Sequence, residues 1–261
     1  MSRSFKAPLA LTAILAIASF ACNPSTATKA QNEEPPAPSA LVQEEETEKP
    51  NAFGLVPMPG VNAPEITKAT KVLMQTDAGD MTIEVYPEAA PNAAKRFLEL
   101  VDKKFYDNTP IFRVVREPKP FVAQFGINWR PGMKEYKEKC FDDDPSLFRL
   151  LPGTLAFAKA GPNTNSTQVF INYGDNSQLR AEGFTTFARI TDGFEAAQTF
   201  KAVGDPAMGL DQGLLWEDGE NYLANQNENH KPNMIIKMEI MKDTPSKPAQ
   251  NAEQPAEQPA K

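Results

Sequence analysis

The sequence predicts an all-β domain, a closed eight-stranded antiparallel barrel capped by two α-helices. Short strand-like runs separated by turn residues recur between about residues 71 and 242 of the 261 residues, whereas apolar residues recur at helical spacing in only two stretches. The 24 prolines are unevenly spread and are densest before residue 66 and at the C-terminal end. The folded part is therefore about 175 residues long, which is enough for one sizeable core.

The eight predicted strands are short and follow one another along the chain, at 72–76, 80–86, 111–115, 121–125, 154–158, 168–172, 184–190 and 234–241. The second strand has the clearest pattern, because Met81, Ile83 and Val85 alternate with the side chains of the opposite face. The turn Asp77-Ala78-Gly79 separates it from the first strand. Closing such strands into a barrel removes the exposed edges of the sheet, so we expect a barrel.

The two predicted helices lie between strands of this series. The first runs from Pro91 to about Lys103, and proline fits the first turn of a helix because the N–H that it lacks has no partner there. The second is short and follows Gly193. Apolar residues recur at helical spacing in both, and they are Ala94, Phe97, Leu98 and Val101 in the first and Phe194, Ala197 and Phe200 in the second.

The N-terminus has the features of a secretory signal peptide over residues 1–21. Arg3 and Lys6 supply the positive charge, and residues 7–18 are apolar, but they are too few to span a bilayer, which takes about 20. The following Ser19-Phe20-Ala21-Cys22 is similar to the lipobox of bacterial lipoproteins, which predicts a lipid on Cys22. Ser19-Phe20-Ala21 also fits an ordinary signal peptidase, and the protein would then be secreted without a lipid.

The remaining boundaries follow from composition. Residues 22–66 are rich in Pro, Glu, Ala and Asn and are predicted to form a flexible linker ahead of a folded domain at 67–242. Residues 243–261 contain a repeated Glu-Gln-Pro-Ala unit and are predicted to be a disordered tail. We therefore expect a domain tethered to a membrane on the periplasmic side of a cell envelope, with the outer membrane preferred; a soluble periplasmic or secreted protein is the alternative.

Charge and residue inventory exclude several classes of function. The net charge is -7 and no block of Lys or Arg occurs, so we expect no nucleic-acid partner. One histidine, His230, and two cysteines, Cys22 and Cys140, are too few for a Cys/His zinc site, so we expect no metal. A Ser-His-Asp triad would have to use His230, and no matching nucleophile motif occurs. Once Cys22 carries a lipid, Cys140 is expected to be a free thiol with a structural role.

Several runs of sequence occur in the order that one family shows. They are GDMTIEVYPEAAP at 79–91, FLELV at 97–101, FYDNT at 105–109, FRVV at 112–115, QFG at 124–126, AGPNTNSTQVFI at 160–171 and GFTTFARI at 183–190. Together they resemble the cyclophilin family of peptidyl-prolyl cis/trans isomerases over most of residues 70–242. The resemblance implies an eight-stranded barrel capped by two helices, and rotation about X-Pro bonds without a metal, a cofactor or a covalent intermediate.

The resemblance also implies the residues of the site. Arg113 is expected to donate a hydrogen bond that weakens the resonance of the prolyl amide, with Gln124 orienting it and Phe121 beside it. The residues expected to bind substrate are Val122, Ala158, Lys159, Ala160, Gln168, Phe170, Leu179 and Phe184. Most of these would form an apolar proline pocket, while the backbone between Ala158 and Ala160 would bond the residue before proline. Without the resemblance, Arg113 reads as an exposed barrel residue and the phenylalanines as core.

The expected partners are proline-containing polypeptides, either unfolded or partly folded exported proteins, bound by a monomer. Phe112 and Lys159 stand where the family has histidine and asparagine, and Gln178 precedes Leu179 where some members have tryptophan. Two alternatives stay open: a proline-peptide-binding module or chaperone with little catalysis, and a structural envelope lipoprotein with a vestigial pocket. The segment 116–120 is longer than usual in the family, and it either forms an exposed loop or reshapes the rim of the pocket.

Overall fold

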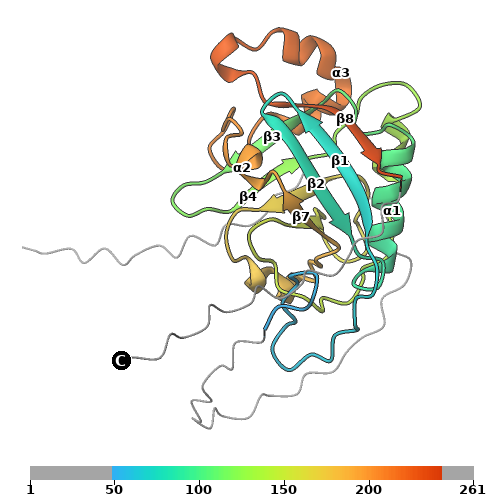
Figure 1. Cartoon of the computed structure of the whole chain (residues 1–261). Coiled ribbons are helices and arrows are strands. Elements are labelled where there is room, and N and C mark those ends of the chain that lie inside the picture. The colour runs from blue at the N-terminus through green and yellow to red at the C-terminus, as the bar shows by residue number, and fades with distance from the viewer. Residues whose placement is uncertain (1–48, 243–261) are drawn as a thin grey trace, which may run out of the picture.

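The computed structural model describes residues 49–242, which form a closed barrel of eight antiparallel strands (Figure 1). The strands are β1 (Thr70–Thr76), β2 (Gly79–Val85), β3 (Thr109–Val115), β4 (Val122–Phe125), β5 (Thr154–Phe157), β6 (Val169–Asn172), β7 (Ala188–Asp192) and β8 (Met234–Ile240). Their order around the barrel is β1-β2-β7-β5-β6-β4-β3-β8, and β8 pairs with β1 to close it. The predicted fold class is confirmed.

Alternation along the strands places one side chain in two inside the barrel. On β2, the predicted inward residues Met81, Ile83 and Val85 are at most 1% exposed. Aromatic rings fill much of the interior, and the rings of Phe97 and Phe187 lie 5.1 Å apart, centroid to centroid. Since full burial of one such side chain stabilises the fold by about 1.5–3 kcal/mol, this core is the main source of stability.

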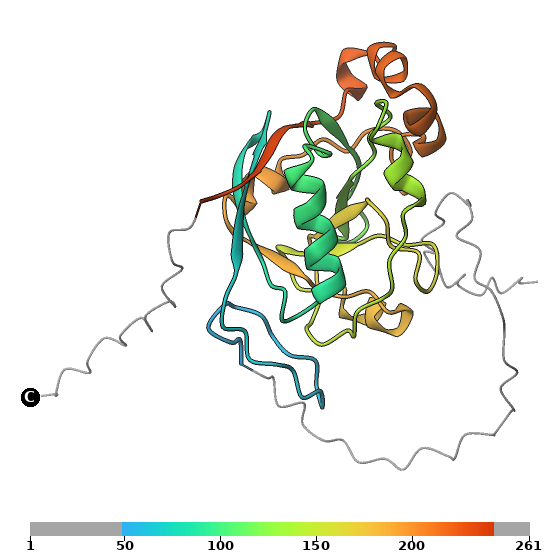
Figure 2. The same ribbon diagram turned by 90° about the vertical axis from the view of Figure 1, so that its right-hand side faces the viewer.

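Two helices pack on the barrel where the sequence predicts them. They are α1 (Pro91–Asp102) and α2 (Phe194–Gln198), and in Figure 1 they lie on opposite sides of the barrel. Helix α1 starts with proline and turns Ala94, Phe97 and Val101 inward. Figure 2 shows α1 lying across the barrel. Short 3-10 turns add η1 (Lys134–Glu138), η2 (Ser177–Glu182) and η3 (Glu228–His230).

A third helix, α3 (Gln212–Ala224), was not predicted and stands outside the barrel (Figure 1). Few of its side chains are buried, chiefly Leu215 and Trp216, and its backbone leaves helical geometry at Asp218, so its apolar spacing is weak. The carboxylate of Asp211 caps it by accepting the Leu214 N–H at 3.0 Å. The cap, rather than an amphipathic pattern, marks this helix.

The seventh strand starts later than the sequence predicts, at Ala188 rather than at residue 184. Gly183 ends η2 with a φ of +77°, and the chain then bonds to a loop instead of to a neighbouring strand. Phe184 O accepts a hydrogen bond from Ser146 Oγ at 2.6 Å, and Thr185 Oγ1 donates to Asp144 O at 2.8 Å. The two phenylalanines of this stretch are buried in different apolar clusters, Phe187 in the barrel core and Phe184 against Phe170, which produces the strand-like pattern.

The predicted linker is only partly a linker, because residues 49–69, the N-terminal arm, pack on the barrel. Leu55 and Ile66 are 1% and 5% exposed and share an apolar cluster with Tyr86 and Phe148. The ring of Phe53 meets that of Tyr86 with centroids 5.7 Å apart. The folded unit therefore begins well before residue 67, because the apolar residues that lie among the prolines pack against the barrel.

The predicted signal peptide at 1–21, the lipid site Cys22, the first part of the linker and the tail at 243–261 lie outside the described residues. Within residues 49–242, no helix is long and apolar enough to cross a membrane. Cys140 is disulfide-bonded, so the expectation of a free thiol there is wrong.

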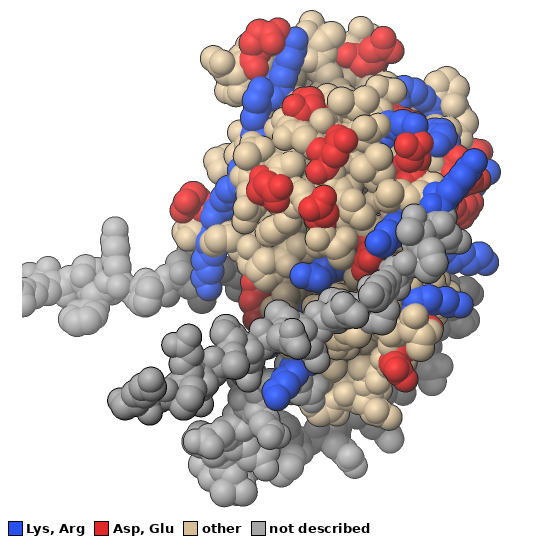
Figure 3. Space-filling model, viewed as in Figure 1, with Lys and Arg blue, Asp and Glu red and all other residues tan. Residues whose placement is uncertain are grey.

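Charged side chains are dispersed over the face shown in Figure 3, where Asp and Glu dot the centre and Lys and Arg lie mainly toward the margins. Some form ion pairs across strands, as Lys71 and Glu84 do on β1 and β2 with 3.7 Å between Nζ and Oε1. The Glu84 side chain of this pair is only 10% exposed, whereas fully exposed ion pairs contribute about 0–1 kcal/mol each. The exposed ion pairs therefore contribute little to the stability of the barrel.

Candidate active site

A β-bulge in β3 directs the side chain of Arg113 out of the barrel. Ile111 pairs with Phe125 and Arg113 with Gln124, so β3 holds one residue more than β4 at this point. Phe112 and Val114 on either side are 0% and 3% exposed and belong to the barrel core. The phenylalanine that replaces the family histidine therefore points inward, away from Arg113.

The Arg113 guanidinium is held at two points. Nη1 donates to Gln124 Oε1 at 2.9 Å, and Nε donates to the carbonyl oxygen of Ala207 at 2.6 Å. Cζ lies 5.7 Å from the centroid of the Phe121 ring. Burial lowers the pKa of Arg113, but a guanidinium stays protonated in proteins. The result is an oriented positive charge over an aromatic ring.

Gln124 and Gln168 come together as the sequence predicts. Gln124 Nε2 donates to Gln168 Oε1 at 2.7 Å, and Gln168 Nε2 donates in turn to Gln212 Oε1 on α3 at 3.2 Å. The Gln124 side chain is buried against Arg113, whereas Gln168 is half-buried. Four side chains therefore form one continuous line of hydrogen bonds.

A small apolar cluster, here called the pocket cluster, lies next to this line. Its buried members are Val122, Leu150, Ala156, Ala158, Phe170 and Phe184, with the half-buried Phe121 and Leu179 packed against them. The rings of Phe170 and Phe184 meet edge to face with centroids 5.7 Å apart. Every apolar residue predicted for the proline pocket is in this cluster.

The pocket cluster is separate from the barrel core because neighbouring residues of a strand face opposite ways. On β6, Val169 and Ile171 belong to the core while Phe170 belongs to the pocket cluster. Phe170 pairs with Gln124 on β4 and with Ala156 on β5, so the outward faces of three adjacent strands supply one surface. That surface is aromatic and aliphatic at the centre and has Arg113 and Gln124 at its edge.

The segment after β5 forms another edge of the site. Ala158 is 7% exposed and belongs to the pocket cluster, whereas Ala160 is exposed. Thr164 Oγ1 accepts hydrogen bonds from the N–H groups of Ala160 and Gly161 at 2.9 and 3.0 Å, which folds the chain back after residue 160. The backbone between the two alanines thus runs along the pocket, as expected.

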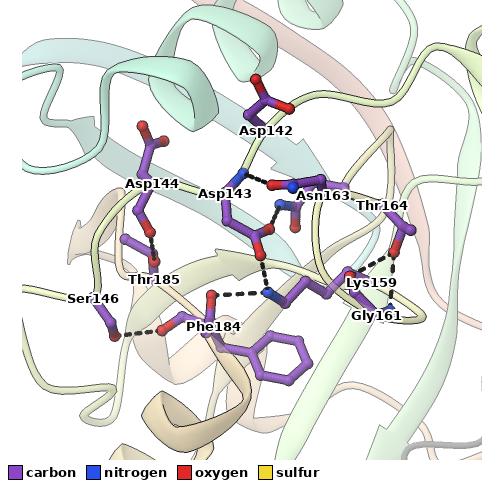
Figure 4. Close-up of polar contacts among 12 residues, drawn as sticks. Asp142, Asp143, Asp144, Ser146, Lys159, Gly161, Asn163, Thr164, Phe184 and Thr185 are labelled. Atoms are coloured by element: carbon purple, nitrogen blue, oxygen red, sulfur yellow. Dashed lines mark hydrogen bonds and ion pairs between the residues drawn. The ribbon is translucent and has the colours of Figure 1, made fainter. Parts of the chain in front are cut away.

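Lys159 lies between them, and its side chain is buried, with Nζ 5.5 Å from the centroid of the Phe184 ring. It is 3% exposed and its Nζ lies 2.6 Å from Asp143 Oδ2, while Nζ also donates to the Gly183 carbonyl at 3.1 Å (Figure 4). The Asp143 carboxylate also accepts a hydrogen bond from Asn165 Nδ2 at 2.6 Å. Of the predicted substrate contacts of Lys159, only those of its backbone fit this position.

Some residues of the site were not predicted from the sequence. Leu150 and Ala156 complete the pocket cluster; Ala156 could have been found from its alternation with core residues on β5. Asp143 and Gln212 are polar residues distant in sequence from their partners, and Ala207 acts through its backbone. No local pattern marks these three.

The long segment 116–120 is an exposed loop with an anchored base. Residues 117–120 are exposed, whereas Arg116 Nη2 donates to the Gln198 carbonyl at the end of α2 at 2.7 Å and its Cζ lies 5.1 Å from the Tyr173 ring centroid. Next to the loop, Phe121 O accepts a hydrogen bond from Asn176 Nδ2 at 2.9 Å. The pocket rim at Phe121 is therefore fixed from behind.

These features define a class of protein: a β-barrel with an outer apolar cluster edged by one oriented arginine and two glutamines. Among residues 49–242, no group of three His, Cys, Asp or Glu residues could hold a metal ion. Residues 71–210, more than half of the chain, match the model of the family described as cyclophilin type peptidyl-prolyl cis-trans isomerase/CLD. The chain belongs to this family of peptidyl-prolyl cis/trans isomerases, as the sequence motifs predicted.

Relatives with the same activity in their names support this membership. The chain is 35% identical over 137 residues to peptidyl-prolyl cis-trans isomerase cypE of Dictyostelium discoideum, covering 51% of this chain and 85% of the relative. It is 31% identical over 157 residues to peptidyl-prolyl cis-trans isomerase B of Escherichia coli, covering 56% and 93%. A crystal structure of a Cryptosporidium parvum cyclophilin type isomerase is 26% identical, with a TM-score of 0.47, covering 67% of this chain and 99% of that one.

Proposed function

We propose that this isomerase accelerates rotation about X-Pro bonds in exported proteins and thereby assists their folding. In this mechanism the pocket cluster seats the proline ring while Arg113 donates to the prolyl amide. One observation carries the proposal. The Arg113 guanidinium is oriented by Gln124, its Cζ lies 5.7 Å from the centroid of the Phe121 ring, and beside it is an apolar cluster that is separate from the barrel core.

The size of the required effect suits this simple site. The barrier to rotation of a peptide bond is about 18–20 kcal/mol, and an X-Pro bond isomerises unaided in tens to hundreds of seconds. Bringing the rate to roughly 10³ per second takes a gain of about 10⁵, or about 7 kcal/mol. No covalent bond is made or broken, so no nucleophile, proton relay or cofactor has to supply it.

The positions of the donors favour stabilisation of the twisted amide over that of the planar one. Two N–H groups of Arg113 bind Gln124 and the Ala207 carbonyl, and a guanidinium has five N–H donors, so others remain for the substrate. As the amide twists, its nitrogen becomes pyramidal and gains a lone pair that accepts a hydrogen bond. A fixed guanidinium binds that state more strongly than the planar one, which is the condition for catalysis.

Peptide orientation follows from the edges of the pocket. In this proposal the backbone at Lys159 hydrogen-bonds the residue before proline, and the half-buried amide of Gln168 binds substrate backbone. The ring of proline, rather than a charged side chain, fits among Phe170, Phe184 and Leu179, since burying an unpaired charge there is costly.

The rate of cis-to-trans conversion of an X-Pro peptide, measured by a coupled assay with the whole chain, tests the proposal. Arg113→Ala is expected to lower kcat/KM by about 10²–10³, whereas Lys95→Ala, at an exposed position on α1, is expected to leave it unchanged. Equal rates for the chain and its Arg113→Ala variant would contradict the mechanism. Retained peptide binding without any rate effect would instead assign the chain to the binding-module alternative.

We also propose that residues 1–21 export the chain and that a lipid on Cys22 anchors it on the periplasmic side of a membrane, with the outer membrane preferred. The support is the sequence pattern of positive charge, short apolar run and small residue before cysteine. Cys22 is the only other cysteine besides Cys140, so the proposal requires that the lipidated chain lacks an intramolecular form of the disulfide that the structure gives Cys140.

Cell fractionation with mass spectrometry separates these two states. We expect the natural chain to sediment with membranes and its N-terminal peptide to carry acyl chains on Cys22, while the Cys22→Ser variant leaves the membrane fraction. A soluble natural chain, or a peptide in which Cys22 is linked to Cys140, would rule out the lipid anchor.

A further inference from the structure

We propose that Gln212, the first residue of α3, is a positioning residue for catalysis because its amide oxygen ends a one-way line of hydrogen bonds that begins at Arg113. The inference rests on the proposed function, since it concerns the same arginine. Gln212 lies beyond residue 210, where the match to the family model ends. The residue therefore belongs to a part of this chain that the family pattern does not describe.

The direction of the line follows from its first member. Arg113 has only donors, so it requires the oxygen of the Gln124 amide at 2.9 Å. The Gln124 amide nitrogen then faces Gln168 and requires its oxygen at 2.7 Å. That leaves the Gln168 amide nitrogen facing Gln212, whose oxygen accepts at 3.2 Å. Each amide has one orientation in which every contact joins a donor to an acceptor.

Without an acceptor at residue 212, the far end of this line is not restrained. Gln168 is half-buried, so its free amide could rotate toward water and draw its oxygen away from Gln124. Gln124 would then lose the partner that fixes it against Arg113. The guanidinium would keep its bond to Ala207 but would sample more than one direction, and a donor that must meet the twisted amide works less well when it is not pre-oriented.

The structure holds Gln212 in place firmly for an exterior helix. Asp211 caps the helix start through Leu214 N–H, and the backbone N–H of Leu215 bonds Asp211 O at 3.0 Å. Further along, Gly219 lies under the Trp129 ring, where a Cβ would come within 2.2 Å of Cε3. Such close packing ties α3 to the rest of the domain and keeps its first residue at the site.

Two substitutions of nearly equal shape separate the acceptor from the bulk of the side chain. Gln212→Met keeps the length but removes the acceptor, and we expect it to lower kcat/KM about three- to tenfold, the loss typical of one hydrogen bond. Gln212→Glu keeps an acceptor, and a carboxylate is favourable in the first turn of a helix, so we expect kcat/KM within about twofold of the natural chain at pH 7. Gln198→Met, at an exposed position of α2, is the control for the chemical change alone.

A second readout does not need activity. The side-chain amide resonances of Gln124 and Gln168 in nitrogen-15 NMR spectra are expected to shift in Gln212→Met and to stay near their natural positions in Gln198→Met. Equal loss of kcat/KM in the Met and Glu variants, or unchanged amide resonances in Gln212→Met, would overturn the inference. If the natural chain itself showed no isomerase activity, the proposed function would fail, and the amide resonances alone would still decide whether Gln212 orders the line.

Discussion

Lys159 Nζ lies 2.6 Å from Asp143 Oδ2 and 3.1 Å from the carbonyl oxygen of Gly183, and so it joins the segment after β5 to the residue that precedes Phe184. Both segments border the pocket cluster. The cation therefore fixes the distance between the backbone expected to hold the peptide and the Phe184 ring expected to hold proline, over which Nζ lies 5.5 Å from the centroid.

Replacing Lys159 by methionine is expected to lower the free energy of unfolding by about 1–3 kcal/mol, because it leaves a largely buried carboxylate without its cation. Asp143 is 23% exposed, so water limits the loss. The double variant Lys159→Met with Asp143→Asn is expected to recover part of it, while kcat/KM stays reduced in both. Lys231→Met is the matched control, because Lys231 pairs with Glu228 at the same 2.6 Å but with side chains 43% and 85% exposed, and its effect on the free energy of unfolding should be much smaller. Urea denaturation measures the free energy of unfolding of all three variants, and equal losses at residues 159 and 231 would contradict the role given to burial.

Phe170 and Phe187 offer a test of the separation between pocket and core. Phe187→Ala opens a cavity in the barrel and is expected to lower the free energy of unfolding by about 3–5 kcal/mol, with kcat/KM of the folded fraction little changed. Phe170→Ala is expected to cost less stability, because its cluster is small and borders the surface, and to lower kcat/KM by about tenfold or more. Thermal unfolding and peptide kinetics on the same preparations check this, and a reversed pattern would show that the two clusters had been assigned to the wrong roles.

Gly209 packs against the strand that carries Arg113, and its replacement should disturb catalysis. A Cβ at Gly209 would lie 2.2 Å from Phe112 O and 2.7 Å from Arg113 Cα, and the residue has a φ of +74°. Gly209→Ala is expected to lower both stability and kcat/KM, since the loop that presents the Ala207 carbonyl must move.

Gly132→Ala is the control that separates backbone strain from contact, because Gly132 has a φ of +79° with nothing within 4 Å of its Cβ position. This substitution should lower the free energy of unfolding by only about 1 kcal/mol and leave kcat/KM unchanged. The same kinetic loss in both variants would refute the contact argument.

Glu88 ties the N-terminal arm to the barrel in a manner that depends on pH. Hydrogen bonds from the Thr67 hydroxyl, at 2.6 Å, and from the Thr67 backbone N–H hold the pKa of this carboxyl below its ordinary value of 4.5. A carboxyl whose pKa is lower in the folded state contributes stability that is present above its unfolded pKa and is lost as pH falls through the folded one. The Thr67 amide resonance should therefore titrate with a midpoint below 4.5, and Glu88→Gln should abolish this titration. A midpoint at or above 4.5 would contradict the assignment.

The sequence predicted the barrel and most of the pocket for two different reasons. Strands such as β2 are recognised by the alternation of apolar and polar residues. This alternation alone predicts that Met81, Ile83 and Val85 form a buried face. Phe121, Phe170 and Phe184 were assigned to the pocket only through the family resemblance, because an outward phenylalanine and a core phenylalanine look alike in one strand.

What could not be predicted depends on contacts between distant parts of the chain. Helix α3 has few buried side chains, so its period was faint. The arm was predicted to be a linker because of its prolines and its acidic neighbours in the sequence. Leu55 and Ile66 are buried there because they pack against Tyr86 and Phe148, which are distant in the sequence. Lys159 was assigned to the substrate because its partner Asp143 lies in a different loop.

Alternation on β6 gives adjacent residues unrelated duties: Val169 and Ile171 face the interior, while Phe170 faces outward. Selection for a stable barrel therefore acts on one set of positions, and selection for particular peptide substrates acts on the positions between them. Substitutions at the outward positions can therefore change which peptide sequences the protein binds without changing the barrel. A protein engineer can use the same separation by varying only every second position along β4, β5 and β6.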